Sequence, residues 1–329
     1  MSVTSHDVAR LAGVSQPTVS RALRAGNQVS ERTRTRVIAA AQELGYVPSE
    51  RGRILATRTT RQIAVVASID NSLYPQLMPP LHDTFAARGY RTVLLAERHA
   101  ELISDERLLD GSVDGAVLTT SSLRSPLPAR LRAHGVPFVE FNRTSGTVPV
   151  DSVTADNHGG GRAVAELLAA GHHRDIAALL GPAQTSTARE REAGLREALR
   201  EHRIRLPSRW VRRVWYSEED GRAAMSALLD AGARRPDAVF CVNDMVGVGA
   251  LNALIERGIE VPTEMAVIGF DDLAVAGWPA FRLTSVRVDF AAMARRAAEL
   301  LIDRIADADR PYVAERFPVR LVLRHSHRR

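Results

Sequence analysis

The sequence predicts an all-α helix-turn-helix headpiece followed by an α/β domain of two doubly wound parallel-sheet lobes. The first 48 residues contain three short amphipathic helical patterns separated by glycine and other turn residues. From residue 61 onward, near-continuous apolar runs of strand length alternate with helical stretches, the pattern of buried parallel strands. A chain of 329 residues is also too long for one small domain.

The first 48 residues are expected to form three helices around one small core. The first helix covers about 5–12 with Ser5 as its N-cap, and Gly13 allows the positive φ of a sharp stop. Ser15 is the expected N-cap of the second helix, and the third covers 30–44. The side chains predicted to face inward are Val8, Leu11, Ala12, Val14, Val19, Ala22, Leu23, Val37, Ile38, Ala41 and Leu44.

The segment 48–60 lies between the headpiece and the α/β part and is basic. Ile54 and Leu55 are its only apolar anchors, which is too little apolar surface for a stable fold of its own. It is therefore either a flexible linker or a segment that becomes helical only on binding.

Strand and helix patterns alternate through the rest of the chain. The predicted strands are 62–68, 92–97, 115–120, 137–142, 176–181, 237–243 and 265–272. The predicted helices are 77–88, 159–170, 190–202, 221–231 and 246–257. Two sheets fit this length better than one, with a boundary near 153–157. A helix over 290–307 then returns the chain to the first lobe, and an edge strand over 317–324 closes it.

Positive charge is concentrated at the N-terminus. All 44 basic residues are arginine, which can reflect genomic base composition alone. Residues 1–60 hold nine Arg against four Asp and Glu, a net +5 (9 − 4) out of +6 for the chain. A basic segment on a near-neutral protein indicates a polyanionic partner, with a solvated basic face as the simpler alternative.

The composition argues against several classes of protein. The single cysteine, Cys241, excludes a disulfide framework and a cysteine-based zinc site, and we expect it to be an inert core residue. No run approaches the roughly 18 apolar residues of a membrane helix, and the N-terminus has no apolar signal region. We therefore expect a cytoplasmic, nucleoid-associated protein that uses no membrane, metal or cofactor.

The sequence resembles the LacI/GalR family of bacterial transcription regulators along its whole length. The runs DVARLAGVSQPTVSRAL (7–23) and VSERTRTRVIAAAQELGYVP (29–48) match the headpiece of that family almost position by position. Further matches follow in the family's order and spacing at 171–182, 191–194, 240–251, 264–272 and 283–290.

The resemblance implies three parts of the chain. Residues 1–48 would be the helix-turn-helix DNA-binding domain, 49–60 the hinge helix or linker, and 61–329 a periplasmic-binding-protein-like effector and dimerisation domain. The lobes of that domain would comprise about 61–155 with 286–315, and 156–285 with 316–329.

In this family the second headpiece helix enters the major groove. Gln16 and Pro17 fall on the positions that set specificity, and Pro17 offers only an apolar contact, such as one to a thymine methyl. Arg and Gln read guanine and adenine edges, whereas Thr and Ser anchor phosphates. The residues implied to contact DNA are Thr4, Ser15, Gln16, Pro17, Thr18, Ser20, Arg21, Arg24, Asn27, Ser30, Arg32, Arg53 and Leu55.

The segment 49–56 corresponds to the family's hinge helix, which pairs with its dimer mate in the minor groove. Leu55 falls on the leucine that wedges between base pairs. Gly52 replaces the usual alanine, which costs about 1 kcal/mol of helix propensity. Arg24 replaces a common asparagine and can add a phosphate contact.

Effector groups in this family come from the carboxyl ends of strands, in a cleft between the lobes. Carboxylate, amide and guanidinium groups suit adjacent hydroxyls, and an aromatic face suits a sugar ring or a base. Asn142 stands where aspartate is common, and Trp215 and Tyr216 are alternatives for one aromatic wall. We expect Asp244 to cap the helix over 245–257 and Asp272 to cap a turn. The implied effector residues are Asn71, Tyr74 and Gln76 in the loop 70–76, with Asn142, Arg191, Trp215, Tyr216, Asn243, Asp271 and Phe290.

We therefore expect a homodimeric repressor of a catabolic operon that binds near-palindromic double-stranded DNA under the control of a sugar, with a nucleoside or purine as the alternative. The chain ends without a heptad tail, which favours a dimer over a tetramer. A transport receptor is opposed by the headpiece and the lack of a signal peptide. An enzyme is opposed because no phosphate-binding loop follows the first strand and no GxSxG is present.

Overall fold

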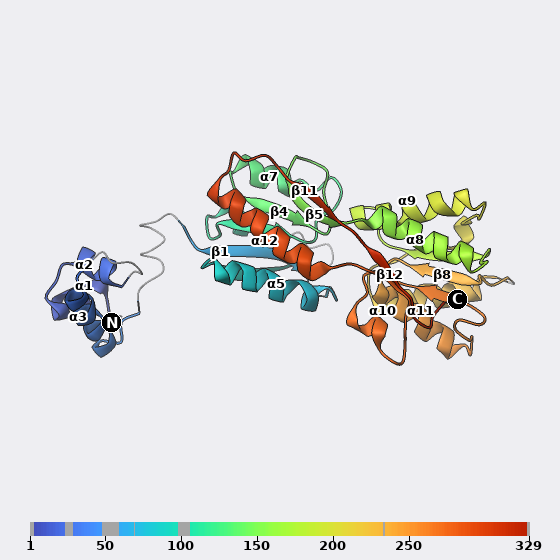
Figure 1. Cartoon of the computed structure of the whole chain (residues 1–329), viewed down its shortest axis with the longest axis horizontal. Coiled ribbons are helices and arrows are strands. Elements are labelled where there is room, and N and C mark those ends of the chain that lie inside the picture. The colour runs from blue at the N-terminus through green and yellow to red at the C-terminus, as the bar shows by residue number, and fades with distance from the viewer. Residues whose placement is uncertain are drawn as a thin grey trace. The chain divides into compact units, whose positions relative to one another are not determined.

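The computed structural model describes residues 3–23, 29–47, 59–68, 70–97, 106–232 and 234–327. The chain forms two compact units, residues 1–60 and 61–329, which are described separately (Figure 1). None of the helices in the described ranges has an apolar stretch long enough to cross a membrane.

The first unit is a three-helix domain of α1 (Ser5–Ala12), α2 (Gln16–Ala22) and α3 (Glu31–Glu43). Gly13 ends α1 in the left-handed conformation, at φ +61°, and so turns the chain sharply into α2. Small side chains let three short helices approach closely. The buried core consists of Val8, Ala9, Ala12, Val19, Ala22, Val37, Ala40 and Ala41.

Two details of the predicted headpiece are wrong. The N-cap of α1 is Thr4 rather than Ser5, since the Thr4 backbone N–H and hydroxyl both donate to the Asp7 carboxylate, at 3.0 and 2.7 Å. Leu11 and Ile38 are exposed rather than inward-facing. At about 100° of rotation per residue, each lies to one side of the stripe that its helix buries, and alanines fill the core positions instead.

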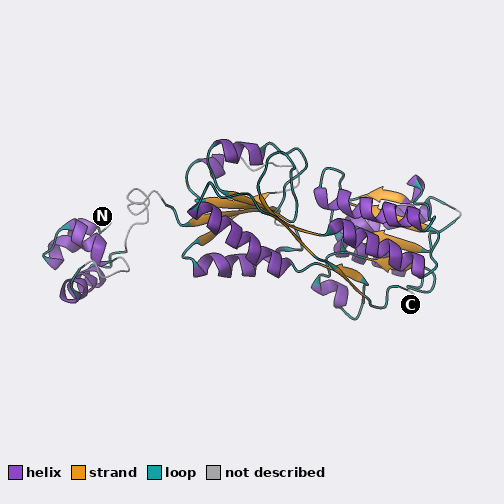
Figure 2. Ribbon diagram, turned by 45° about the horizontal axis from the view of Figure 1, so that its top comes forward, coloured by secondary structure: helices purple, strands orange, loops and turns teal. Residues whose placement is uncertain are grey.

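The first lobe of the second unit contains a six-stranded sheet in which all neighbouring strands are parallel. Helices cover both faces: α5 (Tyr74–Ala87) and α12 (Phe290–Ala306) pack on one, while α6 (Glu106–Leu109) and α7 (Leu127–Ala133) pack on the other (Figure 2). In spatial order the strands are β11 (Ala314–Phe317), β5 (Asp151–Ala155), β4 (Phe138–Phe141), β3 (Gly115–Leu118), β1 (Gln62–Ser68) and β2 (Arg91–Glu97).

The second lobe repeats this architecture on a four-stranded parallel sheet. Alternate residues of β6 face opposite helix layers, as a doubly wound sheet requires. The strands lie in the order β7 (Val211–Arg213), β6 (Ile176–Leu180), β8 (Ala238–Cys241) and β9 (Ala266–Ile268). One face carries α8 (Asn157–Ala170) and α9 (Ser186–Glu201), and the other carries α10 (Glu218–Asp230) and α11 (Asp244–Glu256). Short 3-10 turns lie at Ser208–Trp210 and Ala274–Gly277.

Within residues 106–232 and 234–327 the chain crosses from one lobe to the other at three connections. These connections join β5 to α8, β10 (Ser285–Arg287) to α12, and β11 to β12 (Arg320–Val322). β10 and β12 pair antiparallel, so two of the crossings are joined at their second-lobe ends. The strand predicted over 317–324 is thus two strands, because Pro318 has no N–H for a ladder. β11 also keeps residues 314–317 in the first sheet, past the limit of 315 predicted for that lobe.

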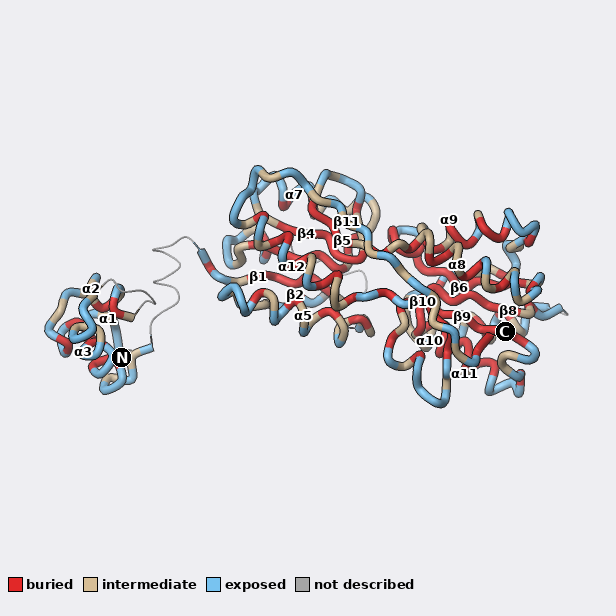
Figure 3. The backbone as a smooth tube through the Cα atoms, in the orientation of Figure 1, coloured by how far each residue is buried: buried red, intermediate tan, exposed pale blue. Residues whose placement is uncertain are grey.

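Burial follows this architecture. Figure 3 shows buried residues along the strands and the inner helix faces of each lobe. The strands therefore end in loops whose side chains emerge at the rim of a rigid sheet, where Asn142, Tyr216, Asn243 and Asp271 all lie shortly after a strand.

Candidate DNA-binding and effector sites

The predicted base-reading residues lie on the outer face of α2. Val19 of this helix is buried in the headpiece core, whereas Pro17 and Arg21 are exposed and Gln16 is partly exposed. The Arg21 Nε donates to the Pro17 carbonyl at 3.3 Å, so the guanidinium is folded along the helix. Thr18 and Ser20 of the same helix are partly exposed as well.

Three of the predicted phosphate-binding residues sit at helix starts. Thr4, Ser15 and Ser30 are the N-cap residues of α1, α2 and α3, and Ser30 accepts the Thr33 backbone N–H at 3.4 Å. Arg32 is exposed in the first turn of α3. The remaining predicted residues, Arg24, Asn27, Arg53 and Leu55, lie outside the described residues, as does the hinge segment 49–58.

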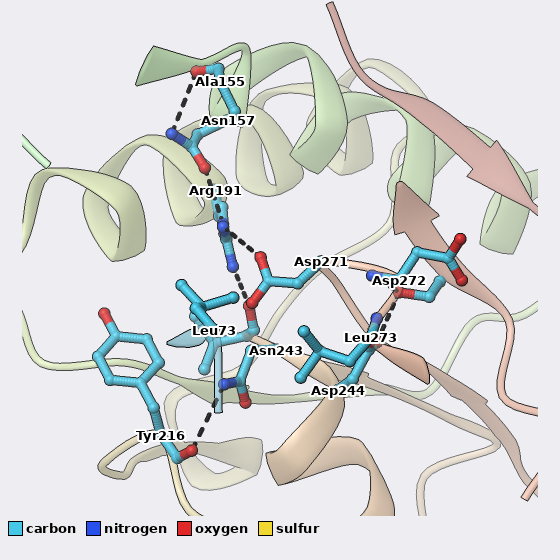
Figure 4. Close-up of polar contacts among 12 residues, drawn as sticks. Leu73, Ala155, Asn157, Arg191, Tyr216, Asn243, Asp244, Asp271, Asp272 and Leu273 are labelled. Atoms are coloured by element: carbon cyan, nitrogen blue, oxygen red, sulfur yellow. Dashed lines mark hydrogen bonds and ion pairs between the residues drawn. The ribbon is translucent and has the colours of Figure 1, made fainter. Parts of the chain in front are cut away.

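In the second unit, Arg191 and Asp271 form a buried ion pair. Their side chains are 3% and 4% exposed, and the Arg191 Nη2 donates to the Asp271 Oδ1 at 2.8 Å. Nε donates to the Asn157 Oδ1 at 2.9 Å, and Nη1 donates to the Val242 carbonyl at 2.6 Å (Figure 4). The guanidinium also stacks on Phe270, 3.7 Å from the ring centre. Each of its nitrogens is therefore held by protein acceptors, and the Asp271 carboxylate is fixed in place.

Asp271 lies in a strained loop. Asp271 has φ +102° and Asp272 has φ +53°, backbone conformations that residues other than glycine rarely adopt. Burial raises the pKa of Asp271, and the neighbouring Arg191 opposes that shift. Such strain persists only where the surroundings hold the backbone firmly.

Asp244 holds this loop and does not cap its helix as we predicted. Its carboxylate accepts the Leu273 backbone N–H at 2.6 Å and the Ser285 hydroxyl at 2.5 Å. Burial, with repulsion from Asp271, raises the pKa of Asp244 well above its usual range. The cap of α11 is instead Asn243, whose Oδ1 accepts the Val246 N–H at 3.0 Å.

Tyr216 joins this group, whereas Trp215 is exposed. The Asn243 Nδ2 donates to the Tyr216 carbonyl at 3.4 Å, and the Tyr216 hydroxyl lies 2.7 Å from the Thr185 Oγ1. The Arg143 guanidinium lies over the Tyr216 ring, 4.7 Å from its centre. Tyr216 thus contacts the predicted Asn243 through its backbone carbonyl, and Thr185 and Arg143 through its own side chain.

Arg143 is a candidate that the sequence reasoning missed, although it directly follows Asn142 at the end of β4. Asn142 has φ +66° and is buried. The Asn142 Oδ1 and the Arg143 Nε are both buried without a hydrogen-bond partner among the described residues. We call Asn142, Arg143, Arg191, Tyr216, Asn243 and Asp271 the effector cluster.

The loop that carries Asn142 and Arg143 is held by Glu140 of β4 and by Ser186 of the other lobe. Both oxygens of the buried Glu140 accept the Ser145 N–H, at 3.0 and 3.1 Å, and burial raises the pKa of this carboxyl. The Thr144 N–H donates to the Ser186 hydroxyl of α9 at 3.0 Å. Residues from both lobes therefore set the geometry of the cluster.

Two of the other predicted effector residues, Asn71 and Phe290, have structural roles in this conformation. Asn71 accepts the Leu73 N–H at 3.0 Å, just before Tyr74 and Gln76 in the first turn of α5. Phe290 is fully buried in the apolar cluster that also contains Leu73 and Phe270. Their part in effector binding stays a prediction.

Cys241 is buried in β8, and burial raises the pKa of its thiol, in keeping with an unreactive core residue. Within the described part of the chain, no set of three or more His, Cys, Asp or Glu side chains is arranged to hold a metal ion.

The two units together define a DNA-binding regulator with an α/β domain suited to a small ligand. Residues 4–49 match the family described as bacterial regulatory proteins, lacI family. Residues 164–327 match the periplasmic binding protein-like domain.

Three comparisons with known proteins support the same class. The chain is 38% identical to the HTH-type transcriptional regulator CelR of Thermobifida fusca, over 96% of this chain and 94% of CelR. A transcriptional regulator CelR–cellobiose complex superposes with a TM-score of 0.75 at 35% identity, covering 98% of this chain and 99% of that one. The lac repressor dimer bound to operator and the anti-inducer ONPF gives 0.88 at 27% identity, with 99% of each chain covered. This chain belongs to the LacI family of bacterial transcriptional regulators and is not an enzyme.

Proposed function

We propose that this protein is a homodimeric repressor of a catabolic operon, that it binds a near-palindromic operator, and that a small sugar in the effector cluster controls its operator affinity. The observation that carries the proposal is the buried Arg191–Asp271 pair in a chain that also contains a helix-turn-helix domain. Arg191 reaches from helix α9 to Asp271, which lies shortly after a strand, as do Tyr216 and Asn243. Because its proposed partner is DNA, we expect the protein to act in the cytoplasm at the nucleoid.

The chemistry of the cluster suits a sugar hydroxyl. The Asn142 Oδ1 is a buried acceptor and the Arg143 Nε a buried donor, and neither has a protein partner among the described residues. A hydroxyl group can donate to one and accept from the other. Since CelR has been solved with cellobiose, that disaccharide is the first candidate effector, and adenosine represents the nucleoside alternative.

An apolar patch on the second lobe supports the homodimer. Ile255, Trp278 and Leu323 are 63%, 56% and 56% exposed. Ile255 and Leu323 line two adjoining surface hollows that share Arg282 and His325 in their walls, and Trp278 lies in sequence between Gly277 and Pro279, which line one hollow each. Exposed apolar side chains clustered in this way mark protein–protein contact surfaces, and a two-fold dimer would cover the same patch on both subunits.

The first experiment measures binding of the gene's own upstream DNA by fluorescence anisotropy. We expect salt-sensitive binding that a fragment of scrambled sequence does not compete away. Equal affinity for the two fragments would overturn the proposed operator function.

The second experiment tests the effector cluster by thermal shift. At about 100 times its Kd, a true ligand stabilises the folded chain by about 2.7 kcal/mol. We expect cellobiose to raise the melting temperature of the wild type and of Arg196→Ala, but not of Arg191→Ala. Arg196 is the matched control because it lies on the same helix but is exposed and paired with Glu192. A cellobiose-induced shift that survives Arg191→Ala would refute the assignment of the site.

A further inference from the structure

Asp272 lies next to the effector cluster but is bonded to the crossings between the lobes. Its side chain is buried and accepts hydrogen bonds from the Arg287 Nε and the Arg324 Nη2, each at 2.5 Å. Arg287 is the last residue of β10, which leads into α12 of the first lobe. Arg324 follows β12, by which the chain returns from the first lobe. One carboxylate therefore holds the ends of two interlobe crossings.

Further bonds fix the same loop to β10. The Asp271 N–H donates to the Val286 carbonyl at 2.8 Å, and the Asp272 N–H donates to the Ser285 hydroxyl at 3.1 Å. Arg324 also donates to the Leu283 carbonyl at 2.7 Å. The loop and both crossings thus move as one body unless these bonds break.

The neighbouring carboxylates point to different partners. Figure 4 shows Asp271 directed at Arg191 and Asp272 turned to the other side of the loop. Because the two residues share a peptide bond and both have positive φ, a backbone change at Asp271 must move Asp272 as well. Any such movement acts on Arg287 and Arg324.

We propose that Asp272 is a positioning residue that couples ligand binding at Asp271 to the relative rotation of the lobes, through its paired contacts with Arg287 and Arg324. The proposal rests on the proposed function, in which ligand binding at the cluster changes operator affinity. Asp272 itself touches neither ligand nor DNA. Its loss should leave each binding event in place and uncouple them, because coupling is a free energy separate from either affinity.

The test compares Asp272→Asn with the wild type in operator binding, without and with saturating cellobiose. We expect operator affinity and cellobiose affinity each to stay within about threefold of wild type. We expect the factor by which cellobiose changes operator affinity to fall at least about tenfold, or to reach one, at which cellobiose no longer changes operator affinity. Asp151→Asn is the matched control, since Asp151 is a buried aspartate paired with Arg304 inside the first lobe. An undiminished cellobiose effect in Asp272→Asn would overturn the proposal.

A second variant covers the case in which Asp272→Asn does not fold. Arg324→Gln removes one of the two contacts from a partly exposed side chain and leaves Arg287 in place. We expect it to lower the cellobiose effect in the same direction but less. Wild-type coupling in a folded Arg324→Gln would contradict the paired contact.

A ligand-free measurement separates this proposal from the proposed function. Spin labels at Ala129→Cys on α7 and Ala223→Cys on α10, both exposed, report the distance between the lobes, while the native Cys241 is buried. We expect Asp272→Asn to broaden or shift the distance distribution and Asp151→Asn to leave it unchanged. An unchanged distribution in Asp272→Asn would refute the proposal. Absence of any cellobiose effect in the wild type would refute only the proposed effector.

Discussion

Arg191→Met tests whether the buried ion pair stabilises the fold as the structure indicates. Both side chains are nearly inaccessible, so removal of the guanidinium leaves the Asp271 carboxylate buried without its cation. Breaking a buried pair in this way costs about 3–5 kcal/mol. The variant also removes the donors to the Asn157 Oδ1 and the Val242 carbonyl. The expected loss is a large part of the roughly 5–15 kcal/mol by which domains are stable.

The double variant Arg191→Met/Asp271→Asn separates the charge from the hydrogen bonds. With no carboxylate left unpaired, the remaining cost should fall to about 1–3 kcal/mol for unsatisfied acceptors. Urea unfolding of the full chain, followed by circular dichroism, measures both, and the exposed Arg196→Met should lose no more than about 1 kcal/mol. A loss below about 1 kcal/mol in Arg191→Met, or a double variant less stable than the single one, would refute the reasoning.

Three further predictions address the headpiece, the loop and the dimer. Leu55→Ala should weaken operator binding far more than binding to scrambled DNA, because a wedge between base pairs acts only at the operator centre; equal losses in anisotropy titrations would remove the wedge assignment. Because the pKa of Asp244 is raised in the folded state, the folded protein holds this proton more tightly than the unfolded chain does. The resulting stabilisation of the fold is present at low pH and is lost as pH rises through the raised pKa. The stability gap between wild type and Asp244→Asn should therefore narrow in urea melts as pH rises above the ordinary aspartate pKa, and a widening gap would contradict the assignment. Ile255→Asp should yield folded monomers in sedimentation velocity, because it places a charge on the exposed patch; an intact dimer would exclude that patch.

Much of the fold follows from sequence periodicity. Strands such as β1 and β6 are continuous apolar runs buried on both faces, and their prediction is confirmed. The short strand β7, of sequence VRR, was not predicted, because its long polar side chains can pair at the edge of a sheet without being buried. β5 was missed for the related reason that it begins with a charged residue, Asp151, which is buried because its carboxylate pairs with Arg304 and accepts the Val313 N–H.

The candidate site could be predicted by residue type but not by role. The family resemblance, which implies effector groups at strand ends, identified Asn243 and Asp271, while only the structure shows that Asn243 caps α11 and that Asp244 braces the loop. Arg143 was missed because nothing in its sequence neighbourhood distinguishes a buried, unpaired guanidinium nitrogen from a solvated one. Tertiary contacts between residues far apart in the sequence, such as Asp244 with Leu273 and Arg143 with Tyr216, decide such roles.

We propose that a ligand at the effector cluster controls how the headpiece binds DNA. The direct test is operator affinity of the wild-type chain as a function of cellobiose, together with cellobiose affinity in the presence and absence of operator. Linkage requires both affinities to change by the same factor, about 5-fold to 150-fold for typical coupling. We expect equal factors of that size, and an operator affinity unchanged at saturating, demonstrably bound cellobiose would contradict the proposed control of DNA binding by the ligand.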